Sequence, residues 1–286
     1  MEIRKYSYAD DFLKENDEFL FRNEAANNLI IGIANGLRGH EKEEDTLMYS
    51  IRENNETSMV LVMTPPRDLI VAGGEPDELT ILLLVNDFIA RGIAIPGILA
   101  ETAFADLFCR KWKEKTGIES LLFRRERVYQ LLKCRETGIS TGQMRMADIS
   151  DTDQIADWIV EFHNEIDEKI ELDAAKRMAE TKIRNKEVFV WIDEGIVSMC
   201  ASDRESRNGK VINLVYTPPD KRKRGYATSC VYYLCKQILA EGKSFCSLYT
   251  DLANQTSNSI YREIGFEPVF DLLHYRFESR RERTTF

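Results

Sequence analysis

Residues 215–228 read VYTPPDKRKRGYAT, and this stretch decides how we interpret the second half of the chain. Two prolines make a bend between an apolar run and an amphipathic one, which predicts a strand, a loop and a helix. Four consecutive cations precede Gly225 at the predicted start of the helix. Helix N-termini attract anions, and small residues such as Gly225 and Ala227 let a phosphate approach the backbone. The sequence therefore predicts a loop that binds a pyrophosphate group.

The basic loop has two other interpretations. It is an ordinary solvated loop if the cations gather there by chance, and a nuclear-localisation or nucleic-acid-binding segment if KRKR itself is recognised. The loop is neither a GxxxxGK[ST] Walker loop nor a GxGxxG dinucleotide loop, but it matches [RQ]xxGx[GA] with Arg222, Gly225 and Ala227. The net charge of the chain is −9, from 48 acidic and 39 basic residues, which argues against a nucleic-acid partner.

The composition predicts a globular protein without a metal. The six cysteines form no CxxC pair and the three histidines are far apart, so we expect neither a disulfide framework nor a metal site. The first residues lack the apolar core of a signal peptide, and no run reaches the roughly 18 apolar residues of a membrane span. We therefore expect a cytoplasmic protein that binds neither membrane nor nucleic acid. The sequence predicts no oligomeric state.

The apolar period is interrupted between Cys134 and Met144, where CRETGISTGQM contains glycine, serine and threonine instead. We place a domain boundary there, with one domain over residues 1–137 and the other over residues 138–286. In the second domain the predicted elements follow the order β-α-α-β-β-β-α-β-α-β, which mixes hairpins with helical crossovers. The predicted fold class is therefore α/β, with a sheet of mixed direction.

A second motif, TDLANQTSNSIYREIGFEPV at residues 250–269, follows the basic loop after one more helix and strand. With it the chain resembles the GNAT superfamily of acyl-CoA-dependent N-acetyltransferases, in which a strand, [RQ]xxGx[GA], a helix and a strand precede N…A/S…Y…GF. The resemblance is close over residues 211–269 and extends in order of elements over residues 143–277. The second motif is matched by Asn254, Ser257, Tyr261, Gly265 and Phe266.

The resemblance implies acetyl-CoA as co-substrate and a primary amine, on a small molecule or a peptide, as acceptor. It also implies direct transfer of the acetyl group in a ternary complex. Tyr261 would protonate the leaving thiolate, and Asn254 would bond the pantetheine arm. The strand residues would pair with that arm and polarise the acetyl carbonyl, while the loop would hold the pyrophosphate. These implied cofactor-binding residues are Val215, Tyr216 and Thr217 on the strand, and Arg222, Lys223, Arg224, Gly225, Tyr226, Ala227 and Thr228 in the loop and helix.

The general base is missing from its usual place. Many GNAT relatives carry a glutamate on the strand before the basic loop, whereas KVINLVYT at residues 210–217 has Asn213 and no carboxylate. An amine with a pKa of about 10.4 must lose a proton before it attacks a thioester, so a base or a water path is needed. A non-catalytic acyl-CoA-binding or regulatory module is therefore the alternative function. Candidate bases elsewhere are Asp203, Glu205, Asp251, His163 and His274.

The first half is expected to be a degenerate GNAT-like or accessory domain. Its own TPP, at residues 64–66, leads into another strand instead of a basic loop. The segment IPGILAETAFADLFCRKW places Glu101 and Asp106 near the start of a predicted helix, where acids would repel a pyrophosphate. The sequence thus predicts two tandem GNAT-like domains, of which only the second binds acetyl-CoA.

Overall fold

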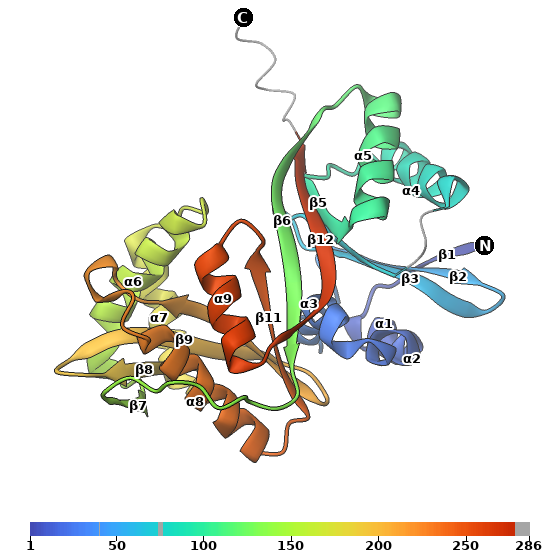
Figure 1. Cartoon of the computed structure of the whole chain (residues 1–286). Helices are drawn as coiled ribbons and strands as arrows, with labels where there is room; N and C mark the ends of the chain where they lie inside the picture. The colour runs from blue at the N-terminus through green and yellow to red at the C-terminus, as the bar shows by residue number, and fades with distance from the viewer. Residues whose placement is uncertain (40, 74–76, 278–286) are drawn as a thin grey trace, which may run out of the picture. The chain divides into compact units, whose positions relative to one another are not determined.

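The computed structural model describes residues 1–39, 41–73 and 77–277, which form two compact units (Figure 1). The first unit comprises residues 1–128, 250–254 and 268–277, and the second comprises residues 129–249 and 255–267. The predicted boundary between residues 137 and 138 falls in the loop between β6 (Ser120–Leu131) and β7 (Gln143–Met146). Each unit nevertheless combines segments from both halves of the chain.

The first unit begins with a short strand and three helices, and then alternates strands with helices. The TPP bend leads into another strand as predicted, with residues 60–63 in the strand before it and residues 69–72 in the strand after it. β1 and β2 are strands that the sequence pattern did not predict. Gly117 ends α5 with a φ of 71°, as expected for a glycine cap. The elements are β1 (Glu2–Lys5), α1 (Ala9–Glu15), α2 (Asp17–Arg22), α3 (Glu24–Gly36), β2 (Leu47–Glu53), β3 (Glu56–Met63), β4 (Leu69–Ala72), α4 (Glu78–Ala90), β5 (Gly97–Glu101), α5 (Thr102–Thr116) and β6.

The sheet of the first unit is completed by the last strand of the chain. Its strand order is β1-β2-β3-β4-β5-β12-β6, where β12 spans Glu267–Phe277. β12 pairs antiparallel with β5, from Leu272 opposite Glu101 to Arg276 opposite Gly97. β4 and β5 are parallel, so the sheet is of mixed direction. One core fills the space between the sheet and α4 and α5, and a second lies between the opposite face and α1–α3.

The second unit repeats this arrangement. Its strands follow the order β11-β10-β9-β8-β7, and residues 129–131 of β6 lie beside β11. α8 and α9 cover one face of the sheet, and α6 and α7 cover the other (Figure 1). Its elements are β7, α6 (Thr152–Glu165), α7 (Leu172–Arg184), β8 (Val188–Ile192), β9 (Ile196–Glu205), β10 (Gly209–Tyr216), α8 (Tyr226–Ala240), β11 (Phe245–Asp251) and α9 (Gln255–Ile264).

The two halves of the chain share one order of elements, a strand and helices followed by β-β-β-α-β-α-β. The predicted α/β class and mixed sheet are thereby confirmed. The shared order also shows that α4, and not α5, occupies the place in the first half that α8 occupies in the second. At the start of α4 the Asp77 side chain accepts hydrogen bonds from the N–H groups of Leu79 and Thr80, at 3.2 and 2.9 Å. A helix end capped by a carboxylate has fewer N–H groups left for an anion.

None of the helices in the described ranges is long and apolar enough to cross a membrane.

Candidate functional site

The strand β10 contains a β-bulge shortly before the basic loop. Asn213 pairs with Ala201 of β9 but Tyr216 pairs with Met199, so β10 has one more residue than its partner over this interval. Leu214, inside the bulge, has a φ of 46°, which is unusual for a residue with a branched side chain. Bulges of this kind interrupt the regular ladder of strand hydrogen bonds, and they re-aim side chains next to functional sites.

Within the described chain, β10 and β11 are parallel neighbours that pair only where both strands begin. The register covers Gly209 opposite Phe245, Lys210 opposite Cys246 and Val211 opposite Ser247. The bulge and the end of β10 therefore lie beyond the paired part. The strand edge at residues 212–216 is thus the part of β10 that an extended ligand could pair with, by addition of a strand-like backbone.

The basic loop leads into α8 with two left-handed residues. Lys223 has a φ of 62° and Gly225, the residue before the helix, a φ of 77°. Within the described chain, the backbone N–H groups of residues 223–228 form no hydrogen bond, and no side chain caps the helix. α8 runs for 15 residues, so its dipole adds partial positive charge at this end. The loop therefore presents several adjacent backbone N–H groups that could donate hydrogen bonds to an anion.

The cations of the loop are arranged in two groups. Lys223 and Arg224 are exposed beside the free N–H groups. Arg222 points back along the loop: its Nε donates to the carbonyl oxygen of Thr217 at 2.8 Å, and its guanidinium forms an ion pair with Glu165 of α6. The Arg222 guanidinium also lies over the ring of Tyr216, 5.7 Å from its centre. Arg222 therefore ties the loop to the end of β10 and to α6.

α6 contributes two carboxylates at the end of β10 that the sequence analysis did not single out. Glu161 accepts a hydrogen bond from the Tyr216 hydroxyl at 2.6 Å, and Glu165, one helical turn later, pairs with Arg222. Burial and the bond to Glu161 both raise the pKa of the Tyr216 hydroxyl. The spacing of four residues between Glu161 and Glu165 was the available sequence signal, because such residues share one face of a helix.

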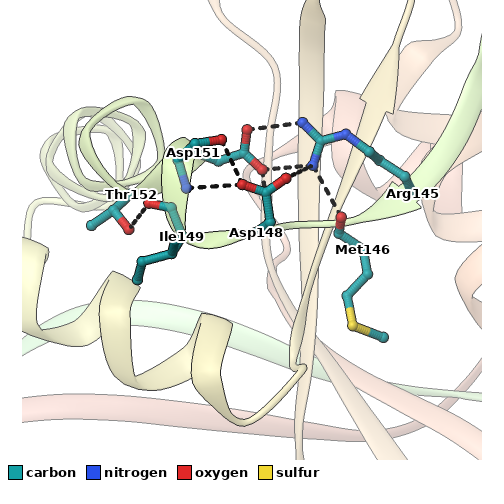
Figure 2. A network of polar contacts seen from close by, with 7 residues as sticks. Arg145, Met146, Asp148, Ile149, Asp151 and Thr152 are labelled. Carbon is teal, nitrogen blue, oxygen red and sulfur yellow. Dashed lines mark hydrogen bonds and ion pairs between the residues drawn. The ribbon is translucent and has the colours of Figure 1, made fainter.

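The start of α6 is fixed by a network of charged groups that precedes it (Figure 2). The Arg145 guanidinium donates to both carboxylate oxygens of Asp151, at 2.6 and 2.8 Å, and the Asp151 side chain is only 7% exposed. Asp148 and Asp151 form a capping box. The Asp151 side chain accepts a hydrogen bond from the Asp148 N–H, and the Asp148 side chain accepts one from the Ser150 N–H. This network sets the position of the helix that carries Glu161 and Glu165.

Tyr261 lies in the core between the sheet and the helices α8 and α9. Its ring is 5.8 Å from that of Phe266 and 6.4 Å from that of Tyr129, and the residue is 7% exposed. Burial raises the pKa of its hydroxyl, against the opposing effect of a hydrogen bond with Ser257. The hydroxyl is therefore protonated at neutral pH. Its proposed catalytic role remains a prediction, and the core position fits an ordinary packing role as well.

The predicted cofactor-binding residues fall into two sets. Those of β10, the loop and α8 all belong to the second unit, and the chain connects them directly. Asn254 lies in the loop before α9, within the segment 250–254 that belongs to the first unit, and its N–H donates to the Asp251 carbonyl oxygen at 3.0 Å. The ligand-binding roles of both sets remain predictions.

Two candidate bases on β9 are held as carboxylates by cations. Burial alone would raise the pKa of Asp203, but the charge of Lys182 and its 2.6 Å hydrogen bond lower it below the ordinary value. Asp203 also accepts from the Asn213 side chain at 2.9 Å, so it reaches the strand where the base was expected. A hydrogen bond from Lys243 lowers the pKa of Glu205. Both carboxylates are weakened as proton acceptors by these contacts.

The remaining candidate bases differ in charge. Burial lowers the pKa of His163 on α6, so this histidine is neutral at pH 7. His274, in the first unit, is buried, yet its hydrogen bond with Asp68 and the Glu126 carboxylate 3.6 Å from its Nδ1 raise its pKa to about 9. A histidine that already carries its proton cannot accept another. Asp251 also belongs to the first unit, and its side chain accepts from the Ala253 N–H at 2.8 Å.

Most cysteines of the second unit are packed thiols. Four of them, Cys200, Cys230, Cys235 and Cys246, are fully buried among apolar side chains. All six cysteines of the chain are free. In the part of the chain that the structure describes, no group of histidine, cysteine, aspartate or glutamate side chains could hold a metal ion.

Comparison with known proteins shows which folds this architecture resembles. Residues 191–275 match the model of the family described as FR47-like protein. No curated protein gives a significant match. A GCN5-related N-acetyltransferase from Sphaerobacter thermophilus is 13% identical, with 96% of this chain and 94% of that chain covered at a TM-score of 0.65. A GNAT-family acetyltransferase from Colwellia psychrerythraea is 12% identical, with 97% and 100% covered at a TM-score of 0.57.

A tandem GNAT protein from the clavulanic acid biosynthesis pathway is also similar. It is 9% identical, with 96% of this chain and 97% of that chain covered at a TM-score of 0.53. At these identities the similarity is one of fold, and it extends over nearly the whole chain. The prediction of two tandem GNAT-like domains is confirmed at that level. The chain is therefore a protein of tandem GNAT acetyltransferase fold, whose second half carries an FR47-like region.

Proposed function

We propose that this protein is an acyl-CoA-dependent N-acyltransferase that transfers an acetyl group from acetyl-CoA to a primary amine, with one active site in the second unit. The observation that carries the proposal is the run of backbone N–H groups at residues 223–228, which form no hydrogen bond within the described ranges. They lie at the start of a long helix and beside exposed cations, and a pyrophosphate satisfies donors of this kind.

The residues of the second unit suit the parts of this cofactor in turn. The N–H groups of residues 223–228, together with Lys223 and Arg224, would hold the pyrophosphate. The unpaired edge of β10 near Tyr216 would take the pantetheine arm, because an extended amide chain can add to a strand edge. Acetyl-CoA supplies an activated acetyl thioester. A backbone N–H near the bulge would stabilise the negative charge that develops on its carbonyl oxygen.

Proton transfer is divided between Tyr261 and water in this proposal. Tyr261 keeps its proton at neutral pH and would donate it to the departing sulfur. Asn213 stands where a carboxylate base was expected, so the amine would lose its proton through water. No covalent intermediate with the protein is needed, and the acetyl group passes directly to the amine.

A non-catalytic acyl-CoA-binding module is the second candidate function. Two observations favour it. Position 213 holds an asparagine instead of a carboxylate, and ion pairs with Lys182 and Lys243 weaken Asp203 and Glu205 as proton acceptors. The two functions share one binding site and differ only in transfer. A screen of thiol release from acetyl-CoA over a broad panel of amines distinguishes them. Release with at least one amine supports the enzyme, and binding without release supports the module.

The binding site itself is tested by thermal unfolding. Acetyl-CoA at about one hundred times its Kd should raise the Tm by about 5 °C, because a ligand that binds only the folded state stabilises it. Gly225→Val should abolish this shift, since Gly225 has a φ of 77° and its Cβ would lie 2.8 Å from the Ser140 Oγ. Gly36→Ala, where a Cβ meets nothing within 4 Å, is the matched control. An unchanged Tm of the wild-type protein would contradict the proposal.

A further inference from the structure

A short segment before β7, residues 138–142, lies against the start of α8. We call it the strap. The Ser140 hydroxyl donates a hydrogen bond to the Arg224 carbonyl oxygen at 2.9 Å, and the Ser140 N–H donates to the Ser229 Oγ at 2.9 Å. The two serine hydroxyl oxygens are 3.1 Å apart. Ser140 thus contacts both the last part of the basic loop and the first turn of the helix.

The rest of the strap is fixed independently of Ser140. The Thr141 hydroxyl donates to Asp193 at 2.8 Å, and Asp193 also accepts from the Tyr226 hydroxyl at 2.5 Å. These bonds lower the pKa of Asp193, so the acceptor stays charged at neutral pH. The Trp191 indole donates to the Thr141 carbonyl oxygen at 2.9 Å. The strap is therefore held in a defined position at the turn between β8 and β9.

The bond from Ser140 to Arg224 has a geometric consequence for Gly225. The carbonyl of Arg224 and the N–H of Gly225 belong to one planar trans peptide unit, in which they point in opposite directions. A carbonyl fixed toward Ser140 therefore directs the Gly225 N–H away from the strap. That N–H has no partner within the described residues, and it is one of the donors at the start of α8.

Ser140 also limits what can stand at position 225. A Cβ at Gly225 would lie 2.8 Å from the Ser140 Oγ, closer than side-chain contacts allow. The hydroxyl occupies the space beside the glycine and prevents the loop from turning toward the strap. The orientation of the Arg224–Gly225 peptide is thus set by the hydrogen bond from Ser140 and by the left-handed φ of Gly225.

We propose that Ser140 is a positioning residue of the anion-binding loop, whose hydroxyl holds the Arg224–Gly225 peptide so that the Gly225 N–H faces an incoming pyrophosphate. The inference rests on the proposed function, because the ligand is the pyrophosphate of an acyl-CoA. It assigns a binding role to a segment that the sequence identified only as a boundary between domains. Pre-orientation of a donor raises affinity because the ligand does not have to order it.

The test measures acetyl-CoA affinity by calorimetry in the full chain. Ser140→Ala should weaken binding by about two- to tenfold, the effect of one hydrogen bond that positions a donor. Ser140→Thr keeps the hydroxyl and should bind like the wild-type protein. Thr141→Val is the matched control, because it removes a hydrogen bond of the strap without touching Arg224. Its affinity should stay within about twofold of wild type.

A spectroscopic measurement separates positioning from general loosening. The amide signal of Gly225 in a proton–nitrogen correlation spectrum should move in Ser140→Ala without ligand, and it should stay in place in Thr141→Val. Wild-type affinity in Ser140→Ala, or an equal loss in Thr141→Val, would overturn the inference while acetyl-CoA binding by the wild-type protein still supported the proposed function. No binding by the wild-type protein would overturn both.

Discussion

At the scale of single residues, Arg222 is bound in a way that its place in the basic loop does not suggest. Its Nε donates to the Thr217 carbonyl oxygen and its guanidinium pairs with Glu165, so its charge is directed toward α6. Lys223 and Arg224 remain as the exposed cations beside the N–H groups. A pyrophosphate bound as proposed would compete with Glu165 for Arg222.

Removal of that competitor should strengthen cofactor binding. Glu165→Gln frees the guanidinium and deletes a negative charge near the loop, so we expect acetyl-CoA affinity to rise by up to about fivefold, the range of an exposed ion pair. Glu161→Gln is the control, because Glu161 lies one turn away and bonds Tyr216 instead of Arg222. Calorimetric titration of both variants measures the effect. Weaker binding in Glu165→Gln would show that the ion pair supports the loop rather than competing with the ligand.

His274 predicts a pH dependence for the stability of the first unit. Burial works against its charge, but Asp68 and Glu126 raise its pKa to about 9, against an ordinary value near 6.5. The charged histidine therefore stabilises the fold fully below pH 6.5, and this contribution is lost as the pH rises through 9. The shift corresponds to roughly 3 kcal/mol.

Denaturant unfolding between pH 6 and pH 10 checks this prediction. The wild-type free energy of unfolding should fall above about pH 7 by more than that of His274→Gln, which cannot titrate. The difference between the two curves isolates the histidine from lysine and cysteine groups that titrate in the same range. Parallel curves would contradict the assigned charge.

At the scale of elements, the start of α6 depends on two acids of unequal burial (Figure 2). Asp151 is 7% exposed and receives a two-pronged bond from Arg145, whereas Asp148 is 65% exposed and mainly caps the turn. Asp151→Ala removes this bond and the acceptor of the Asp148 N–H, while Asp148, 3.8 Å from the guanidinium, remains a partner of Arg145; the change should cost about 2 kcal/mol. Asp148→Ala loses one cap and should cost about 1 kcal/mol. Urea unfolding measures the free energy of unfolding that each variant loses, and equal losses in the two variants would contradict the prediction.

Most elements could be predicted because burial leaves a periodic trace in the sequence. The apolar residues Val231, Leu234, Cys235 and Ile238 recur at helical spacing in the sequence, and they are buried on one face of α8. Gly265, with a φ of 113°, follows the last residue of α9, and a glycine is the usual residue at such a helix end. Local periodicity and turn chemistry were sufficient for these features, since each involves neighbours in sequence.

The features that escaped prediction depend on partners distant in sequence. The bulge at Leu214 carries no glycine or proline and follows from the register with β9. Ser140 has ordinary neighbours, and its contact with Arg224 joins residues 84 positions apart. No local pattern encodes contacts of this kind.

At the scale of the whole molecule, each compact unit depends on both halves of the chain. Residues 268–277 complete the sheet of the first unit, and residues 129–131 belong to the second. We therefore expect a fragment of residues 1–137 to lack a stable fold, because β5 and β6 lose the strand between them. Co-expression with residues 138–286 should restore a folded complex. Circular dichroism and thermal unfolding show whether the fragment is folded. A cooperative transition of residues 1–137 alone would contradict the expectation.

The position of β12 in the sequence also delays folding of the first unit during translation. β5 leaves the ribosome with apolar residues such as Ile98 and Ala100, but β12, which covers its edge, is translated about 170 residues later. At ordinary synthesis rates the delay is on the order of ten to thirty seconds. An open apolar edge attracts other chains during that time. The first unit therefore matures only after β12 has been synthesised, and a ribosome stalled before β12 would leave it exposed to chaperones and proteases.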